Sequence, residues 1–203
     1  MGKLIVTEFV TLDGVAQAPG GPDEDRDGGF AHGGWQAPLA DEESIGVIFE
    51  QASSMDALLL GRRTYEIFAG YWPNAPREIP FTDLLNGVPK YVASRTLASP
   101  LAWQASTLLG DDLAESITTL KERHDEIHVI GSLDLLQSLL RFGLVDSLNL
   151  WLYPLLLGSG KQVFAEGTVP LALRLTESVT YPSGTLHLTY ETAGVPTYGN
   201  LAE

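Results

Sequence analysis

Residues 57–65, Ala-Leu-Leu-Leu-Gly-Arg-Arg-Thr-Tyr, decide how the rest of the chain is interpreted. An apolar run of strand length ends at Gly61, and Arg62, Arg63 and Thr64 then open an amphipathic helix. The first N–H groups of a helix have no partner within the helix and carry the positive end of its dipole, so this turn suits a phosphate. Because Gly61 has no side chain, an anion can approach the backbone there. The same pattern also fits an ordinary strand-to-helix turn with two solvated arginines.

The bulk composition favours one folded domain. The chain has 203 residues and is 44% hydrophobic, which suits a single sizeable core. It has no cysteine, so disulfides and thiolate metal sites are excluded and a reducing compartment fits. No stretch is long and apolar enough to span a bilayer, and residues 1–6 run directly into strand-like sequence without a signal-peptide pattern. We therefore expect a cytoplasmic protein with no membrane partner.

The charge balance restricts the choice of ligand. The formal net charge of -14 argues against a nucleic-acid partner, whose phosphates most of the surface would repel. The few cations are therefore informative. Four of the 12 Lys and Arg residues lie beside the ends of predicted central strands: Arg62, Arg63, Lys90 and Arg95. We expect them to form a local positive patch that draws a small anionic ligand into one cleft.

Strands and helices are predicted to alternate over the first two thirds of the chain. Apolar and β-branched runs predict strands at 3–10, 55–60, 90–95 and 127–131. Helical spacing predicts helices at 42–54, 62–71, 112–123 and 133–141, with a short one near 82–85. Asp41 and Ser132 are the expected N-caps of two of these helices. Alternation of this kind implies right-handed crossovers and a mostly parallel sheet.

The pattern changes after Gly143. Three consecutive strands are predicted there, at 147–153, 172–181 and 185–192, and the last two are joined by a short turn. They add an antiparallel hairpin to the parallel sheet. We therefore expect one α/β domain over residues 1–194, with a mostly parallel central sheet flanked by helices, followed by a tail at 195–203.

A long loop without a structural pattern is expected at residues 18–34, which are rich in Gly, Pro and Asp. Loops of this length inside a domain are usually functional lids or disordered insertions. Trp35 ends the loop, either as a cap over a pocket or as an anchor of the loop in the core.

Three predicted strand ends carry anion-binding residues: Gly61–Thr64, Ser94–Arg95 and Gly131–Ser132. Ligands of open α/β sheets bind outside the carboxyl ends of the strands. Two of these ends open helices, which suits the two phosphates of a pyrophosphate. Ser94 and Arg95 offer side-chain recognition of another anion, such as a ribose 2′-phosphate. The cofactor that fits is NADPH, although the first strand lacks the G-x-G-x-x-G turn of Rossmann domains.

Six motifs occur in the order of a known family. They are Thr-Leu-Asp-Gly at 11–14, Leu-Gly-Arg-Arg-Thr-Tyr at 60–65, Val-Ala-Ser-Arg at 92–95, Val-Ile-Gly-Ser at 129–132, Gly-Leu-Val-Asp at 143–146, and Pro-Leu-Leu-Leu-Gly-Ser-Gly-Lys-Gln-Val-Phe at 154–164. The chain resembles the dihydrofolate-reductase-like superfamily over about residues 3–192. Within it, the C-terminal reductase domain of the bifunctional riboflavin-biosynthesis deaminase/reductase is the closer match. The resemblance implies NADPH as hydride donor and a homodimer.

The resemblance also implies positions for the cofactor. It places Gly61, Arg62, Arg63 and Thr64 at the phosphates, Ser94 and Arg95 at the adenosine 2′-phosphate, Gly131, Ser132, Leu133 and Leu135 under the pyrophosphate and nicotinamide, and the backbone of Val15 and Ala16 at the carboxamide. The family usually has a second glycine where this chain has Ser132. The Cβ of a serine restricts close approach of a ligand to the backbone.

The resemblance suggests a source for the proton as well. Folate reductases place a carboxylic acid at the start of the second helix, after a tryptophan. Here Trp35 precedes Asp41 at a spacing that is one residue longer, so Asp41 is the candidate acid and Trp35 a candidate substrate contact. Asp13 is the second candidate for the acid or for a group that contacts and orients the substrate. Helix capping by Asp41 and turn formation by Asp13 explain both residues without chemistry.

Two functions from different classes follow. The first is an NADPH-dependent reductase of a small pyrimidine- or pteridine-like heterocycle, whose sharper version reduces a ribosylaminopyrimidine phosphate to its ribityl form. The histidine and cysteine ligands of a zinc deaminase domain are missing, so only the reductase step is expected. The second is a dimeric protein that binds NADPH without turnover.

Two further expectations concern metals and assembly. His124 and His128 are spaced like a zinc pair, but a helix is predicted to end and a strand to begin between them, so no metal site is expected. Leu148, Leu150 and Leu152 alternate along the strand with Asn149, Trp151 and Tyr153. The alternation predicts that the Trp151 side of this strand meets a partner subunit, unless a helix covers that side.

Overall fold

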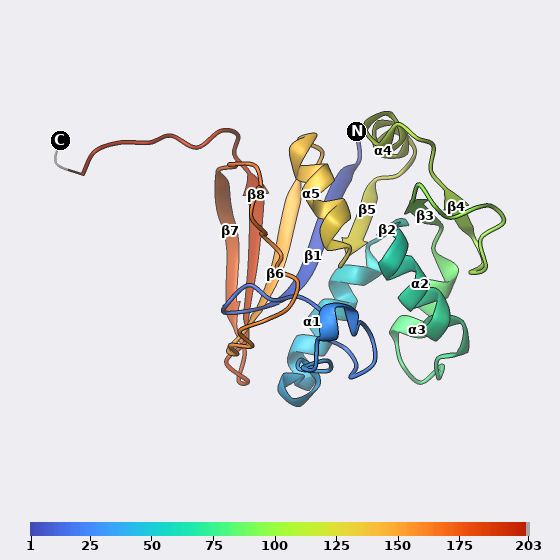
Figure 1. Cartoon of the computed structure of the whole chain (residues 1–203), viewed down its shortest axis with the longest axis horizontal. Coiled ribbons are helices and arrows are strands. Elements are labelled where there is room, and N and C mark those ends of the chain that lie inside the picture. Colours follow the sequence, from blue (N-terminus) through green and yellow to red (C-terminus); the bar gives the residue numbers. More distant parts are fainter. Residues whose placement is uncertain (202–203) are drawn as a thin grey trace.

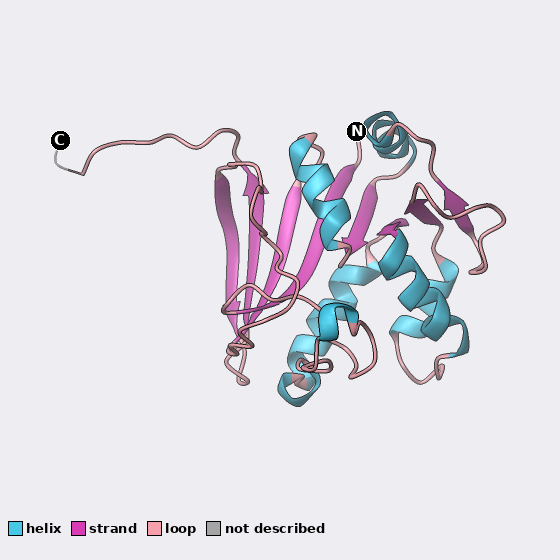
Figure 2. Cartoon of the chain, in the orientation of Figure 1, coloured by secondary structure: helices cyan, strands magenta, loops and turns pink. Residues whose placement is uncertain are grey.

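One eight-stranded sheet runs through the molecule in the order β4-β3-β2-β5-β1-β6-β8-β7, with helices on both faces (Figures 1 and 2). The computed structural model describes residues 1–201. The strands are β1 (Lys3–Thr11), β2 (Ala57–Gly61), β3 (Lys90–Ala93), β4 (Ser106–Leu108), β5 (Glu126–Ile130), β6 (Ser147–Tyr153), β7 (Leu173–Thr180) and β8 (Leu186–Thr192). The helices are α1 (Glu42–Ser53), α2 (Arg62–Tyr71), α3 (Phe81–Gly87), α4 (Leu113–Arg123) and α5 (Leu133–Arg141).

The pairing of the strands confirms the expected α/β sheet. The six strands from β4 to β6 in this order pair in parallel, whereas β8 pairs antiparallel with β6 and β7 antiparallel with β8. Parallel pairing leaves the carboxyl ends of β1, β2, β3 and β5 at one edge of the sheet, where the turns that follow them meet.

Strand β2 shows why its sequence is apolar at consecutive positions. Leu58 and Leu60 pack into one core cluster with residues of α1, α2 and α3, and Ala57 and Leu59 pack into another with residues of α4 and α5. All four residues are 0% exposed. A parallel strand that is covered on both faces needs an apolar residue at every position, not at alternate ones.

Two details of the sheet differ from the sequence prediction. Strand β4 was not predicted, because its three residues carry no apolar pattern and are ordered by pairing with β3. Strand β3 ends at Ala93, two residues earlier than expected. The hydroxyl of Ser94 accepts hydrogen bonds from the backbone N–H groups of Thr96 and Leu97, so the chain turns at this point and does not continue as a strand.

Lys90 does not belong to the positive patch that the sequence predicted. It begins β3, at the opposite end from Ser94, and is 0% exposed. Its ammonium group donates to the carbonyl oxygens of Leu85, Asn86 and Val88 at 2.9–3.1 Å and lies 4.3 Å from the centre of the Trp103 ring. Burial lowers the pKa of Lys90 to about 8. Lys90 therefore holds the C-terminal end of α3 and is not available to an external anion.

The Trp151 side of β6 is covered within the subunit, so the prediction that it meets a partner is wrong. Trp151 is 0% exposed, and its ring stacks on that of His187 with 4.5 Å between the ring centroids. Val47 and Ile48 of α1 belong to the same apolar cluster. The alternative in which a helix covers this face is the one observed.

Residues 18–34 and Trp35 fold back onto the same cluster. Trp35 is 7% exposed, its indole N–H donates to the carbonyl oxygen of Gln17 at 2.8 Å, and its ring meets Tyr153 edge-on. Of the two roles considered for Trp35, the structure shows the core anchor. After Gly194 the described chain forms no helix or strand and runs away from the sheet (Figure 1). Among the described helices, none has both the length and the apolar character that crossing a bilayer requires.

Candidate functional site

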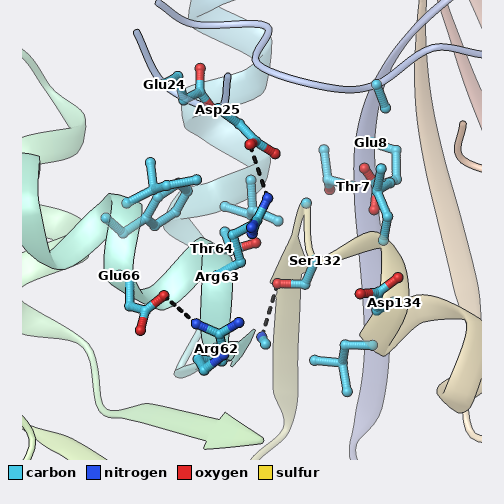
Figure 3. Close-up of a pocket in the computed structure, with 18 of the residues that line it drawn as sticks. Thr7, Glu8, Glu24, Asp25, Arg62, Arg63, Thr64, Glu66, Ser132 and Asp134 are labelled. Atoms are coloured by element: carbon cyan, nitrogen blue, oxygen red, sulfur yellow. Dashed lines mark hydrogen bonds and ion pairs between the residues drawn. The ribbon is translucent and has the colours of Figure 1, made fainter. Parts of the chain in front are cut away.

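A cavity of about 1500 Å³ opens at the carboxyl ends of β1, β2, β3 and β5 (Figure 3). All three strand ends that were predicted to bind anions line this cavity. The sequence-predicted residues that line it are Ala16, Gly61, Arg62, Arg63, Thr64, Ser94, Arg95, Gly131, Ser132, Leu133 and Leu135. Val15, Asp13, Trp35 and Asp41 are not among the lining residues. A single drug-sized ligand fills about 300–1,000 Å³, so this volume suits a larger ligand or two ligands together.

Direct contacts hold the turns after β2 and β5 together. The hydroxyl of Ser132 accepts a hydrogen bond from the backbone N–H of Gly61 at 2.9 Å. The N–H of Gly131 donates to the carbonyl oxygen of Thr7 at 3.2 Å, which ties the same turn to β1. A Cβ added to Gly131 would lie 3.7 Å from the methyl carbon of Thr64. The turns after β2 and β5 and strand β1 therefore form one continuous rim.

Ser132 does not cap α5 with its side chain, contrary to the sequence prediction. Its φ of 71° is in the left-handed region, and its hydroxyl is directed to Gly61 and not to the first turn of α5. A left-handed serine is strained by roughly 1–2 kcal/mol, and the bond to Gly61 helps to offset that cost.

Both helices that open at the cavity begin without a side-chain cap. Neither α2, which follows Gly61, nor α5, which follows Ser132, receives a capping hydrogen bond from a side chain. Their first backbone N–H groups are consequently available at the rim, with the positive ends of the two helix dipoles beside them. An anion can be bound there by main-chain donors.

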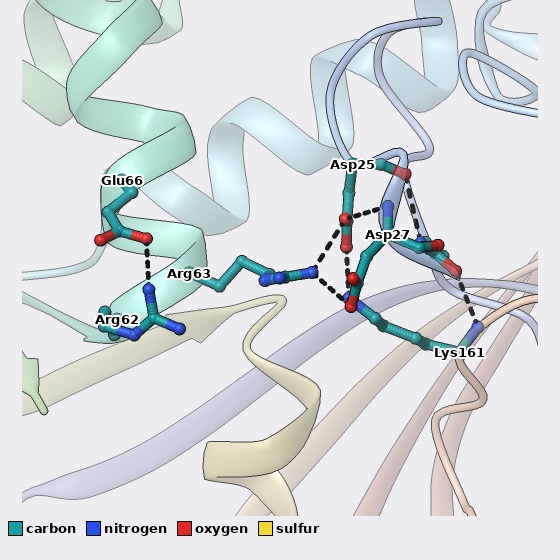
Figure 4. A network of polar contacts seen from close by, with 7 residues as sticks. Asp25, Asp27, Arg62, Arg63, Glu66 and Lys161 are labelled. Atoms are coloured by element: carbon teal, nitrogen blue, oxygen red, sulfur yellow. Dashed lines mark hydrogen bonds and ion pairs between the residues drawn. The ribbon is translucent and has the colours of Figure 1, made fainter. Parts of the chain in front are cut away.

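The two arginines at the start of α2 already have carboxylate partners (Figure 4). Arg63 contacts Asp25 and Asp27 at 3.1 and 2.6 Å, and Lys161 contacts the same two carboxylates at 2.7 and 3.0 Å. Hydrogen bonds from Lys161 and Arg63 lower the pKa of Asp27. Arg62 pairs with Glu66 of its own helix at 2.8 Å. The loop of residues 18–34 is thus held at the cavity by ion pairs that the sequence did not predict.

The third strand end is different. Ser94 and Arg95 line the cavity from the turn after β3, and Arg95 is exposed. Within residues 1–201, no carboxylate forms a salt bridge with Arg95. This guanidinium can therefore take an external anion without breaking an existing pair.

Two buried polar residues line the cavity that the sequence analysis did not place there. Glu8 is 2% exposed, its Oε1 atom has no hydrogen-bond partner, and burial raises its pKa to about 8. His128 is also 2% exposed, its Nε2 atom lies 3.5 Å from a carboxylate oxygen of Glu126, and burial lowers its pKa. The available signal was a lone acid inside the apolar strand Leu4–Val10, and a lone histidine inside β5.

The two acids that the sequence proposed have other contacts. Asp41 accepts from the backbone N–H of Ser44 at 2.9 Å, which lowers its pKa, and it caps α1. Asp13 accepts from Thr11 and from the N–H groups of residues 157 and 158, and these bonds lower its pKa as well. A carboxylate that is held in its charged form is a poor proton donor at neutral pH.

Metal binding has no candidate in the described part of the chain. No group of three or more His, Asp or Glu residues within residues 1–201 is placed to hold an ion. His124 bonds to the hydroxyl of Tyr91 at 2.9 Å.

Comparison with known proteins assigns the architecture and then the family. The order of the strands and the cavity at their carboxyl ends define a dihydrofolate-reductase-like α/β domain. Residues 2–187 match the model of the RibD C-terminal domain. The chain belongs to this family of reductases, which typically use NAD(P)H.

Individual relatives agree with this assignment. The uncharacterized protein YyaP of Bacillus subtilis is 26% identical over 202 residues, which is 95% of this chain and 96% of YyaP. A putative riboflavin biosynthesis protein from Shewanella sp. PV-4 has a similar structure, with a TM-score of 0.73, 20% identity, and coverage of 94% of this chain and 99% of that one. A deaminase/5-amino-6-(5-phosphoribosylamino)uracil reductase from Thermotoga maritima gives a TM-score of 0.63 at 16% identity, over 95% of this chain and 57% of the longer enzyme.

Replacing Asp41 with alanine tests its capping role. We expect Asp41→Ala to lower the melting temperature by about 2–4 °C, the usual effect of losing a helix cap in a domain of this size, and to leave NADPH binding unchanged. Thermal unfolding followed by circular dichroism measures the first quantity and fluorescence titration the second. A variant with normal stability and lost binding would show that Asp41 acts in the cavity.

Glu8 predicts a pH dependence of stability. Burial raises the pKa of Glu8 from its ordinary value of 4.5 to about 8 in the folded protein, so the folded state binds this proton more tightly. The associated stability is complete below about pH 4.5 and is lost as the pH rises towards 8. Denaturant unfolding at pH 5 and pH 8 should show that wild type loses on the order of a few kcal/mol more than Glu8→Gln. Equal losses in the two proteins would contradict a neutral Glu8.

Proposed function

We propose that this protein is an NADPH-dependent reductase of a pyrimidine- or pteridine-like heterocycle. One observation carries the proposal: the uncapped N-termini of α2 and α5 meet at a single cavity whose rim also holds Arg95. The two helix N-termini suit the two phosphates of a pyrophosphate, and the guanidinium of Arg95 suits a 2′-phosphate. The reductases of this family, which typically use NAD(P)H, support the same cofactor.

The residues present fit this cofactor. Backbone N–H groups at the starts of α2 and α5 are available to the phosphates, and Gly131, with φ of 66°, leaves the turn without a side chain. Ser94 and Arg95 line the same cavity, and in this proposal they bind the 2′-phosphate. Arg63 is paired with Asp25 and Asp27, so main-chain donors support phosphate binding here more directly than this side chain does.

The remainder of the cavity suits a flat, polar-edged substrate. When bound, NADPH supplies a hydride. Ile45 and Ile48 of α1 offer an apolar wall, while Thr7, Gln51 and His128 offer polar groups on the same side of the sheet. Such a mixture of apolar walls and few polar groups is typical of small-molecule sites. The reduction named for the Thermotoga enzyme, which acts on 5-amino-6-(5-phosphoribosylamino)uracil, is the sharper version of this proposal.

The alternative is a protein of the same fold that binds NADPH without turnover. It is favoured by the placement of Asp41 and Asp13, which do not line the cavity and are held in their charged forms. Measurement of NADPH oxidation over a panel of pterins and aminopyrimidines separates the two. Oxidation with one of these substrates supports a reductase, and binding of NADPH without any oxidation supports the alternative.

Replacing Arg95 with alanine tests the choice of cofactor. We expect Arg95→Ala to weaken NADPH binding roughly 10–100-fold and to leave NADH binding unchanged, because only NADPH carries the 2′-phosphate. Arg123→Ala removes the same charge from the last turn of α4, outside the cavity, and is the matched control. Equal losses for both nucleotides would place Arg95 elsewhere on the ligand. Failure of the wild type to bind either nucleotide would contradict the proposal.

We further propose a homodimer, formed through the opposite face of the sheet from Trp151. Leu150, Leu152 and Leu188 on this face of β6 and β8 are only partly buried, and Leu175 of β7 is 49% exposed. Register pairs Leu150 with Leu188 and Leu175 with Tyr190, so these side chains share one surface. Apolar residues gathered on an open sheet face suit a second copy of the chain.

Sedimentation velocity at micromolar concentration tests this assembly. We expect the wild type to sediment as a dimer and Leu175→Arg to sediment as a monomer, since a charge on this face disfavours burial. Leu156→Arg places the same charge on a 74% exposed residue outside the strands and should remain dimeric. A monomeric wild type would contradict the proposal.

A further inference from the structure

Glu8 is a buried acid without a partner at the edge of the cavity. It is 2% exposed, its Oε1 atom accepts no hydrogen bond, and it lines the cavity beside Thr7 (Figure 3). A buried polar group that stays unpaired destabilises the folded state. Buried polar groups are usually hydrogen-bonded, as Lys90 is in this protein, where its ammonium group donates to three carbonyl oxygens. Glu8 has no such partner for Oε1, and it lines a ligand-sized space.

The register of the sheet places Glu8 beside the turn that opens α5. Thr7 pairs with Ile130 of β5, and the carbonyl oxygen of Thr7 accepts from the N–H of Gly131. Glu8, the next residue of β1, therefore lies level with the Gly131–Ser132 turn. In the proposed function this turn passes under the pyrophosphate and nicotinamide of the cofactor.

The charge state of Glu8 limits what it can recognise. Burial raises its pKa to about 8, and no charged neighbour contributes to the shift. At neutral pH the group is mostly the carboxylic acid, which has one O–H donor next to one carbonyl acceptor. The complementary partner has a carbonyl acceptor next to an N–H donor, as in a carboxamide or a ring lactam. A cationic ligand would instead require the charged carboxylate.

We propose that Glu8 pairs, as a neutral carboxylic acid, with an amide edge of a ligand bound in the cavity. This inference rests on the proposed function, because the two sources of such an edge are the carboxamide of the nicotinamide and the lactam of the heterocyclic substrate. Glu8 is a specificity residue in this proposal: it selects ligands that carry both an acceptor and a donor on adjacent atoms.

Two variants separate shape from hydrogen bonding. Glu8→Gln keeps an acceptor beside a donor at every pH, whereas Glu8→Met fills a similar volume with no such pair. Glu8→Met removes an unpaired polar atom, so we expect it to fold with a melting temperature at or above that of the wild type. Glu191→Gln, which breaks an ion pair with Arg174 between β8 and β7, is the matched control for loss of an acid outside the cavity.

Binding is measured with two probes, one for each source of the amide. The first compares NADPH with its reduced 3-acetylpyridine analogue, in which a methyl ketone replaces the carboxamide, and the second is 5,6-diaminouracil. At pH 6.5 we expect Glu8→Met to lose roughly tenfold or more in affinity for one probe, and Glu8→Gln and Glu191→Gln to keep it. If the cofactor supplies the edge, the wild type prefers NADPH over the analogue and Glu8→Met does not. If the heterocycle supplies it, only 5,6-diaminouracil binding falls.

The pH dependence gives a second readout that does not require catalysis. In the wild type, affinity for the responding probe should fall as the pH rises above about 8, because the ionised acid has no donor, and it should be constant in Glu8→Gln. The carboxyl carbon of Glu8, assigned by ¹³C NMR from its absence in Glu8→Gln, should titrate near the same pH and shift when the probe binds.

The outcomes distinguish this inference from the function on which it rests. Wild type that binds NADPH while Glu8→Met binds both probes equally well overturns the role of Glu8 alone. A Glu8 resonance that titrates near pH 4.5 does the same. Wild type that binds neither probe overturns the proposed function and the role of Glu8 together.

Discussion

The insertion of β5 between β1 and β2 is the constraint on which the site depends. Ile127 pairs with Leu4 on one side and with Ala57 on the other, and all three residues are 0% exposed. As a result, the turn at Gly131 lies between β1 and Gly61. The carbonyl oxygen of Thr7 in β1 accepts from the N–H of Gly131, and the hydroxyl of Ser132 accepts from the N–H of Gly61. A slip of one residue in β5 would turn its apolar side chains to the wrong face, so burial enforces the register that assembles the rim.

The sequence was informative wherever structure depends on near neighbours. Apolar runs ending in glycine located the strand ends, and alternation of strands and helices correctly indicated the parallel sheet with its antiparallel addition. The three turns that were predicted to bind anions were found in this way, and they line one cavity. What failed depends on distant residues: β4 is ordered only by β3, and the carboxylate partners of Arg63 lie in a loop almost forty positions earlier.

Two buried titratable residues show the same dependence on distant parts of the chain. Lys90 and Glu8 both lie in apolar strands. Their residue types alone do not show that Lys90 is structural and that Glu8 lines the cavity. The difference lies in what surrounds each group once the chain has folded: three carbonyl oxygens meet the ammonium of Lys90, and none of the described residues bonds to Oε1 of Glu8. Hydrogen-bond accounting separates the two where residue type does not.

The ion pairs between the loop and the rim have a consequence for the thermodynamics of anion binding. Asp25 and Asp27 already neutralise Arg63 and Lys161, so a phosphate that reaches these cations replaces one set of anions with another. The net electrostatic free energy of binding is the difference between the cation–phosphate and the cation–carboxylate interactions, which are similar, and dissolved salt screens both of them. Carboxylates set free by such an exchange would no longer tether residues 25–27, so occupancy of the cavity by an anion and the position of this loop would be thermodynamically linked.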